Sequence, residues 1–467
     1  MTEEADGEQS RFRPTAHPLQ RIGACALAVL GEASTPAELD PGAFEKAVRH
    51  MADDAATAVL VRNTKSERGF WLKASHSFFP NSKMNHPGNV RRTDDDLRDA
   101  VRRWRIRPAR AAWPPVACVL CGSAAVGFYG KVDVPLAESD LYRNSTPRGH
   151  TGMALCWPCV CGFHALPYGC RLTGGQSIAL HSWDDRFMAR TSSRQVQRNR
   201  RLIALGQPDP RRVPAREVVA LQELRAHDDR LTAGVDLLVF SNENRGHSLE
   251  IQSLEQPLAE WLRRSSRPPR GRGFPALLRA HATTSRPSVV GLARNAFRAP
   301  GRIVGASARY LISGLERGVL RDETSALATS CFSFTTEVMR MNQNEIDEIR
   351  SVGTQVAAWL AEADSAGALR ELNSTLKEPK RMRHWLMRRN LDALLNSKSH
   401  SRGPLVTDDQ FRLLFDPEVE TPGSIASSSS CRWSSGCTSW VSSRPTASGS
   451  RRRWPTKCPT TPRTPTT

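Results

Sequence analysis

Long apolar runs and lysine are both scarce in this sequence of 467 residues. The longest apolar runs, around Ala24–Leu30 and Val235–Phe240, fall well short of the roughly 18–20 residues that cross a bilayer. The acidic stretch Met1–Ser10 has neither the positive start nor the apolar core of a secretory signal. We therefore expect no membrane partner and a cytoplasmic location. In that compartment the eleven cysteines would stay reduced and would not form a disulfide framework.

Positive charge is carried almost wholly by arginine. Nine lysines leave 57 arginines among the 66 basic residues, which face 47 acidic residues and give a net charge of +19. GC-rich codon usage explains arginine in place of lysine, but it does not explain the excess of positive over negative charge. A protein this basic is expected to bind a polyanion, and guanidinium groups match phosphates and base edges well.

Local signals in the sequence predict several helices and one hairpin. Asp40 before Pro41, and Thr93 before three aspartates, are typical helix starts. Val235–Phe240 and Leu249–Leu254 predict two antiparallel strands around a turn at residues 242–246. From residue 297 to about 415 the pattern is helical, with an apolar stripe formed by Ile346, Ile349, Val356, Trp359 and Leu360.

Changes in composition along the chain predict an α+β protein of two or three domains. Cysteine, glycine and proline become frequent at residues 111–175, where helical periodicity disappears. The segment 263–275 is rich in arginine, proline and glycine, which indicates a linker or mobile loop. The expected divisions are a disordered tail at 1–14, a mixed N-terminal domain at 15–262 containing a cysteine-rich module at 111–175, a basic linker at 263–275, a mainly helical domain at 276–420, and a disordered tail at 421–467.

The last segment has an unusual composition. Residues 421–467 hold 12 Ser, 9 Thr, 6 Pro and 6 Arg, one Ile, one Val, and neither Leu nor an acidic residue. Such a segment cannot bury enough apolar surface to offset its ordering entropy. One hypothesis is a frameshifted end, since GC-rich codons in the wrong frame give this mixture; the alternative is a natural low-complexity tail. If the end is out of frame, the preceding helices lack a partner and their apolar stripe is expected to be partly exposed.

Two CxxC pairs carry the clearest chemical signal. Cys118 and Cys121 form the first pair, Cys156 and Cys159 form the second, and 34 residues lie between the two pairs. Four thiolates at this spacing predict a closed, structural Zn²⁺ site without a catalytic position. Reduced buried thiols and a redox pair are the alternatives. Other side chains close enough in sequence to compete as ligands are Cys161 and Cys170, and more weakly His150 and His164.

Catalytic signatures are absent from the sequence. It has no P-loop, no dinucleotide fingerprint and no Gly-x-Ser-x-Gly elbow. His227-Asp228 resembles the metal-binding dyad of HD phosphohydrolases, but no companion histidine and aspartate stand in a matching context, so we expect a solvated helix face there. A metal-dependent nuclease would also need a carboxylate cluster that the sequence does not show. We therefore expect no enzymatic activity.

Basic residues gather in three stretches. Runs of this kind are usually solvated surfaces, but three separate runs in a protein of charge +19 favour binding to nucleic-acid phosphates. The stretches are Arg91, Arg92, Arg98, Arg102, Arg103, Arg105, Arg107 and Arg110; Arg194, Arg198, Arg200 and Arg201; and residues 263–272.

Several motifs, in this order, resemble the type I-B CRISPR-associated large subunit of the Tneap subtype, a member of the Cascade surveillance complex. The resemblance covers about residues 15–260 well and residues 300–415 only as generic helix. Its motifs are His17-Pro-Leu-Gln-Arg-Ile-Gly23, Phe79-Pro-Asn-Ser82 with Asn85 and Pro87, the two CxxC pairs with Asn144-Ser-Thr-Pro-Arg-Gly149 between them, Ala165-Leu-Pro-Tyr-Gly169, Leu180-His-Ser-Trp-Asp184, Asn199-Arg-Arg-Leu-Ile-Ala-Leu-Gly206, and Phe240-Ser-Asn242.

The resemblance implies a non-catalytic subunit that works with a CRISPR RNA and other Cascade subunits. Such a subunit reads the protospacer-adjacent motif on target double-stranded DNA, helps to open and load that DNA, and recruits a helicase-nuclease. Motif reading needs polar side chains on a braced loop. In the loop at 79–87, Asn81, Lys83 and Asn85 would reach outward, while Asn81 and Ser82 could alternatively only cap a turn. The residues expected to contact nucleic acid, in this loop and in the first two basic stretches, are Asn81, Ser82, Lys83, Asn85, Arg91, Arg92, Arg102, Arg103, Arg105, Arg198, Arg200 and Arg201.

A different class of protein shares some of these features. A stand-alone zinc-ribbon regulator would also combine four cysteines with basic patches and bind DNA. It predicts a compact DNA-binding module and a self-association surface, with no need for a long helical region after the hairpin.

Overall fold

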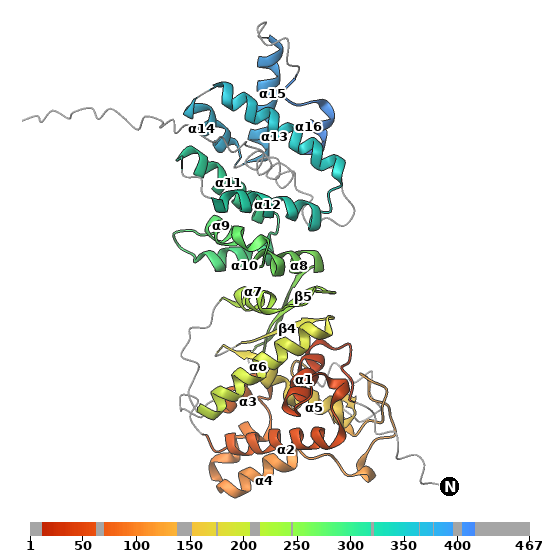
Figure 1. The fold of residues 1–467 in the computed structure, drawn as a ribbon. Coiled ribbons are helices and arrows are strands. Elements are labelled where there is room, and N and C mark those ends of the chain that lie inside the picture. The colour runs from red at the N-terminus through yellow and green to blue at the C-terminus, as the bar shows by residue number, and fades with distance from the viewer. Residues whose placement is uncertain are drawn as a thin grey trace, which may run out of the picture.

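A computed structural model of the chain describes residues 12–61, 70–137, 152–173, 176–205, 215–243, 246–318, 322–363, 365–376, 378–395 and 404–415. The fold is mixed α+β, as the sequence predicts. Figure 1 shows an elongated arrangement, with the first helices at one end, a sheet in the middle and the later helices stacked toward the other end. The tail predicted at 421–467 lies outside the described residues.

The N-terminal half is built from helices around a small sheet. Strands β1 (Gly127–Tyr129) and β2 (Met153–Leu155) pair antiparallel. The helices are α1 (Pro18–Leu30), α2 (Pro41–Ala58), α3 (Phe70–Phe78), α4 (Asp94–Trp104), α5 (Trp157–Gly169) and α6 (Asp185–Leu205), with short 3₁₀ turns at η2 (Pro36–Glu38), η3 (Lys83–Asn85), η4 (Pro87–Arg91) and η5 (Arg110–Ala112).

The central sheet has the order β3-β4-β5-β6, and all of its neighbouring strands are antiparallel. Its strands are β3 (Arg171–Leu172), β4 (Ser177–Ser182), β5 (Val235–Glu243) and β6 (Gly246–Leu254). On β5, Leu237 and Val239 face one core while Leu238 and Phe240 face another. Because successive strand residues point to opposite faces, β5 serves both cores, which explains its unbroken apolar run.

Helices make up the rest of the described chain. They form one continuous core with the sheet, from Ile178 to Leu414. These helices are α7 (Arg216–Ala226), α8 (Gln256–Ser265), α9 (Phe274–Ala280), α10 (Ser288–Arg298), α11 (Arg302–Glu316), α12 (Asp322–Glu337), α13 (Gln343–Ala363), α14 (Ala366–Thr375), α15 (Pro379–Leu395) and α16 (Asp408–Phe415), with the 3₁₀ turn η7 (Arg270–Gly273) before α9. None of the described helices is both long and apolar enough to span a bilayer.

The features that depend on neighbouring residues, the helix caps and the hairpin, agree with the predictions from the sequence. The Asp40 carboxylate accepts hydrogen bonds from the amides of Gly42 and Ala43, and the Thr93 hydroxyl accepts one from Asp96. The β5–β6 hairpin is confirmed, with Phe240 opposite Leu249. Residue 12, predicted to lie in the N-terminal tail, is packed on the fold, because Phe12 is buried against the ring of Phe44.

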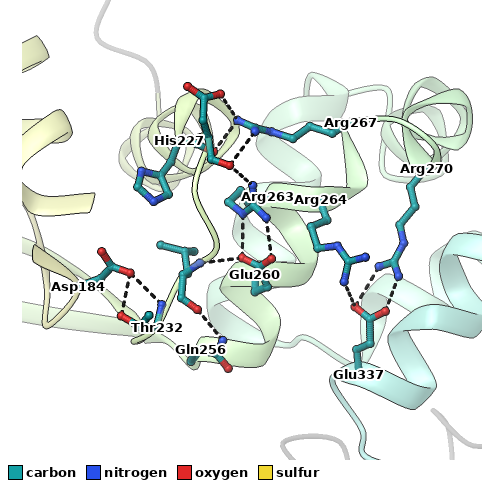
Figure 2. A network of polar contacts seen from close by, with 12 residues as sticks. Asp184, His227, Thr232, Gln256, Glu260, Arg263, Arg264, Arg267, Arg270 and Glu337 are labelled. Carbon is teal, nitrogen blue, oxygen red and sulfur yellow. Dashed lines mark hydrogen bonds and ion pairs between the residues drawn. The ribbon is translucent and has the colours of Figure 1, made fainter. Parts of the chain in front are cut away.

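The segment at 263–275 is not a linker. Its arginines lie at the end of α8 and in η7, and Figure 2 shows them in ion pairs: Arg263 with Glu260, and both Arg264 and Arg270 with Glu337. Arg267 pairs with Asp228 at 3.1 Å. These pairs engage Arg263, Arg264, Arg267 and Arg270 with acidic partners, whereas Arg272 is exposed, so most of the charge of the third basic stretch is paired within the fold.

Helix α5 interrupts the region where the sequence indicated no helix. Nearly all of its side chains are buried, so it lacks the polar face that would reveal a helical period. It crosses α1 closely, since a Cβ at Gly23 would lie 1.9 Å from the carbonyl oxygen of Gly162. Only glycine permits this approach.

The apolar stripe of α13 is covered at its start and partly exposed at its end. Ile346 and Ile349 are buried, whereas Trp359 and Leu360 are only partly buried, and the ring of Trp359 packs against Trp385 of α15 at 5.2 Å. Exposed apolar side chains also lie on the C-terminal half of α15, at Met387, Leu391, Leu394 and Leu395.

Candidate metal centre and nucleic-acid interface

The first cysteine pair lies on a tight turn. The Cys118 amide donates to the carbonyl of Ser123 at 2.7 Å, and the Gly122 amide donates back to the carbonyl of Cys118 at 2.9 Å. Gly122 has a φ of +78°, a conformation that residues with a side chain rarely adopt. The turn therefore holds Cys118 and Cys121 on the same side of the chain.

The second pair begins helix α5. Cys156 is the N-cap residue, and Cys159 lies in the first turn. Helix N-termini stabilise thiolates through their unpaired amides and the helix dipole. The pairing of β1 with β2 brings this helix start beside the first turn, and the Val119 amide donates to the carbonyl of Ala154 at 3.0 Å.

The four cysteines form one cluster. Their Sγ atoms all lie within 4.8 Å of one another, and those of Cys121 and Cys156 are 3.4 Å apart. A tetrahedral tetrathiolate zinc site, with Zn–S distances near 2.3 Å, needs sulfur separations of about 3.8 Å. Hydrogen bonds from the neighbouring thiols of Cys118, Cys156 and Cys159 lower the pKa of Cys121, so a thiolate is favoured there. The cluster could hold a metal ion.

Three of the four competing ligands named from the sequence do not join this cluster. Cys161 and Cys170 are fully buried in the apolar core, and burial raises the pKa of both thiols. The His164 ring is bonded through Nε2 to Asp133 at 2.9 Å, and His150 lies outside the described residues. Among the residues that the structure describes, the four CxxC cysteines are the group with metal-ligand geometry.

The loop at 79–87 is braced by its own asparagine. Phe78 and Phe79 are buried and anchor the loop in the core. The Asn85 amide, however, turns inward: its oxygen accepts from the Ser75 hydroxyl at 3.1 Å, and its nitrogen donates to the carbonyl of Phe79 at 3.1 Å. Asn85 is therefore a structural residue of the loop and does not reach outward, contrary to the prediction.

Of the remaining polar residues of this loop, one is buried and two are exposed. Ser82 is buried, so it is also removed from the set of outward-facing residues. Asn81 and Lys83 are exposed. The side chain of Asn89 donates to the carbonyls of Lys83 and Met84 at 2.8 and 3.1 Å, which fixes the backbone beneath Lys83.

Arg105 is not a surface cation. Its side chain is buried, and the guanidinium lies 3.9 Å from the ring centre of Trp104 and 4.9 Å from that of Phe79. Burial lowers the pKa of Arg105 to about 10, while Asp133 partly offsets this effect. Arg105 is the C-cap residue of α4 and lies one turn after the buried Val101, whereas Arg102 and Arg103 lie on the exposed side of the helix.

The first two basic stretches meet around α2. Arg102 of α4 pairs with Asp53 at 3.2 Å. Beside it, Asp54 accepts from the Tyr168 hydroxyl at 2.6 Å. Burial raises the pKa of Asp54, and Tyr168 and Arg200 of α6 act in the opposite direction. Arg102 of α4 and Arg200 of α6 thus both lie near the end of α2. The expected residues that are exposed here are Arg91, Arg92, Arg102, Arg103, Arg200 and Arg201, with Arg198 half-buried.

Sequence reasoning missed the residues that join these stretches. Arg102 is 49 residues from Asp53, and Tyr168 is 114 residues from Asp54. No spacing in the sequence marks contacts between such distant positions.

The His227-Asp228 dyad also differs from expectation. His227 ends α7 and is fully buried against the ring of Phe187, whereas a solvated helix face was predicted. Burial lowers the pKa of His227, with Asp184 acting in the opposite direction. Asp228 is held in ion pairs by Arg190 and Arg267, at 3.3 and 3.1 Å. The dyad is therefore part of the same internal network as the third basic stretch.

No protein-family model, curated protein or solved structure matches this chain. The function is therefore inferred from the metal centre, the loop and the basic surface.

Proposed function

We propose that this chain is the non-catalytic large subunit of a type I CRISPR RNA-guided surveillance complex in the cytoplasm. In this role it recognises the protospacer-adjacent motif of target double-stranded DNA, with a CRISPR RNA and the other Cascade subunits as partners, and it recruits a helicase-nuclease. The ordered sequence motifs support this proposal.

One observation carries the nucleic-acid part of the proposal. Exposed Arg102 of α4 pairs with Asp53, and exposed Arg200 of α6 acts electrostatically on the adjacent Asp54, so cations from two helices far apart in sequence lie near the end of α2. The turn η3, with exposed Lys83 and the adjacent Asn81, packs against α4. A cationic surface next to a rigid polar loop suits DNA binding, since phosphate contacts position the duplex and the loop meets base edges.

The metal in this proposal is a structural Zn²⁺. Soft thiolate ligands in a closed tetrahedral set favour zinc, and four protein ligands leave no position for a substrate. Cys118, Cys121, Cys156 and Cys159 would hold the ion. When bound, the ion would join the tight turn of Cys118 and Cys121 to the start of α5, and its role would be structural only.

The stand-alone zinc-ribbon regulator is less well supported. That class calls for a compact module, whereas Cys118, Cys156 and Cys159 belong to a large core that also includes α1 and α2. A second continuous core extends from the sheet to α16. A subunit of a large assembly accounts for this extended helical region better than an independent regulator does.

Binding measurements on the assembled complex separate motif recognition by the loop from phosphate binding by the surface arginines. Asn81→Ala and Lys83→Ala are expected to reduce the preference for duplexes that carry the motif. Arg102→Gln and Arg103→Gln are expected to weaken binding to all duplexes about equally. Each lost phosphate contact should reduce the slope of log K against log salt by about 0.9.

Arg105→Gln is the matched control, because this neighbouring arginine is buried. It is expected to leave the salt slope unchanged. The proposal is wrong if loop variants and surface-arginine variants change binding in the same way, or if the chain does not assemble with a CRISPR RNA and backbone subunits.

A further inference from the structure

A cationic cavity lies between the central sheet and two helices, away from the loop at 79–87. Its volume is about 400 Å³, which is within the range of small-ligand sites. Ile178 of β4 and Val239 of β5 supply apolar lining, and Gln176 is exposed at the start of β4. Three arginines complete the lining: Arg216 of α7, and Arg294 and Arg298 of α10.

A buried carboxylate organises these arginines. Glu217 is only 1% exposed, and its oxygens lie 3.1 Å from Arg298, 3.8 Å from Arg294 and 3.9 Å from Arg216. Arg216 is also bonded to both carboxylate oxygens of Glu250, at 2.5 and 2.7 Å. Three guanidinium groups therefore face two carboxylates, and an excess positive charge remains in a preorganised cavity.

Glu217 holds one of these arginines only at long range. The Nε of Arg294 lies 3.8 Å from Glu217 and makes no hydrogen bond in the described structure, while the Arg294 side chain is 38% exposed. A ligand oxygen at the exposed part of this side chain would add a close, charge-assisted hydrogen bond that Glu217 does not supply. Phosphate oxygens match guanidinium donors in charge and geometry.

We propose that this cavity binds the phosphate of a nucleotide unit, with Arg294 and Arg298 on the phosphate and the nearly buried Ile178 and Val239 in the lining beneath them. The phosphate can belong to a single-stranded nucleic acid or to a free mononucleotide. This site is separate from the motif-reading surface, and its existence does not depend on membership of a CRISPR complex.

The test uses the full-length, metal-loaded protein and two probes. Fluorescence anisotropy follows a labelled single-stranded oligothymidylate, and calorimetry follows thymidine monophosphate. The double variant Arg294→Gln with Arg298→Gln is expected to weaken binding of the recognised probe about tenfold. For the strand, the salt slope should fall by about 0.7 for each lost phosphate contact.

Two further variants keep the result interpretable. Gln176→Trp is intended to block the cavity without touching the ion pairs, so it decides the question if the arginine variant does not fold. Arg412→Gln is the control, because this exposed arginine is paired with Asp408 at 3.1 Å on a different helix. It is expected to match the wild type.

Each outcome has one meaning. Loss of strand binding without mononucleotide binding identifies a backbone phosphate as the ligand. Mononucleotide binding that both cavity variants abolish identifies a free nucleotide. The proposal is overturned if neither probe is affected by the cavity variants, or if Arg412→Gln weakens binding as much as they do. Loss of motif discrimination in the loop variants would leave this conclusion unchanged.

Discussion

Replacing Cys156 with serine is expected to abolish metal binding and to unfold much of the N-terminal half. Structural zinc binds small domains with apparent free energies of about 10–16 kcal/mol, and this energy is also folding energy. The whole stability of a domain is about 5–15 kcal/mol. Loss of one thiolate therefore removes an amount comparable to the total. Cys118, Cys156 and Cys159 are each no more than 3% exposed, so water cannot replace the ion as their partner.

The effect should extend beyond the cysteine segments themselves. Cys156 begins α5, and α5 packs closely on α1 through Gly23 and Gly162. Disorder at the start of α5 should thus make α1 sensitive to proteases. Elemental analysis of reduced wild-type protein should find one zinc per chain, and the Cys156→Ser variant should contain far less and show a weaker near-ultraviolet circular dichroism signal.

Cys161→Ala is the matched control for this experiment. Cys161 is fully buried two residues from Cys159, and its raised pKa marks it as a neutral thiol outside the cluster. The variant should keep one zinc per chain and lose about 1 kcal/mol, the cost of a small cavity. A Cys156→Ser variant that melts like the wild type, or wild-type protein with well under one zinc, would refute the structural metal site.

Three other predictions concern pH, packing and the tail. Burial holds the pKa of His164 at about 4, below the value of about 6.5 in an unfolded chain, so stability should be complete above about pH 6.5 and fall by up to about 3 kcal/mol toward pH 4. Urea denaturation of His164→Gln should show a smaller fall, and an identical fall would contradict the assignment. Gly23→Ala places a methyl group 1.9 Å from the oxygen of Gly162 and should lower the free energy of unfolding by at least about 3 kcal/mol. In the control Gly367→Ala the nearest atom is 3.5 Å away, so the free energy of unfolding should change by less than about 1 kcal/mol. Equal melting temperatures for the two variants would argue against the tight crossing of α1 and α5. Deleting residues 421–467 should leave the melting temperature unchanged because the segment has almost no aliphatic residues to bury, and a lower temperature would mean that it packs on the fold.

Features that depend on nearby residues could be predicted from the sequence. The helix caps at Asp40 and Thr93, the hairpin, and the gathering of four cysteines all follow from short spacings with a direct geometric meaning. Helix α5 could not be found in this way. It is buried on almost every side, so its sequence has no alternation between polar and apolar faces.

Whether each arginine or asparagine is exposed or paired within the fold was the part of the site that the sequence predicted least well. An arginine-rich stretch looks the same in sequence whether its charges face water or acidic partners. Arg270 is 67 residues from Glu337, and Arg267 is 39 residues from Asp228. Likewise, Asn85 serves the loop through Ser75, and no local pattern distinguishes this role from an outward one. Only tertiary contacts decide which polar residues remain available to a ligand.

Helix α5 connects the cysteine cluster to the basic surface. Its first residues carry Cys156 and Cys159, and its other end, about 20 Å away at 1.5 Å per residue, carries Tyr168. Tyr168 donates to Asp54, which lies next to Asp53, the partner of Arg102.

The same end of α5 is held by the basic helix α6. The side chain of Asn199 donates to the carbonyls of Pro167, Tyr168 and Cys170 at 3.2, 2.8 and 2.9 Å. Of these carbonyls, that of Pro167 also accepts from the Cys170 amide at 3.4 Å, and that of Cys170 also accepts from the Gln195 side chain at 3.3 Å. Asn199 is flanked on α6 by Arg198 and the exposed Arg200. A metal ion bound at one end of α5 would therefore fix the positions of the arginines at its other end, so nucleic-acid affinity should depend on the metal even though the four cysteines touch none of these arginines.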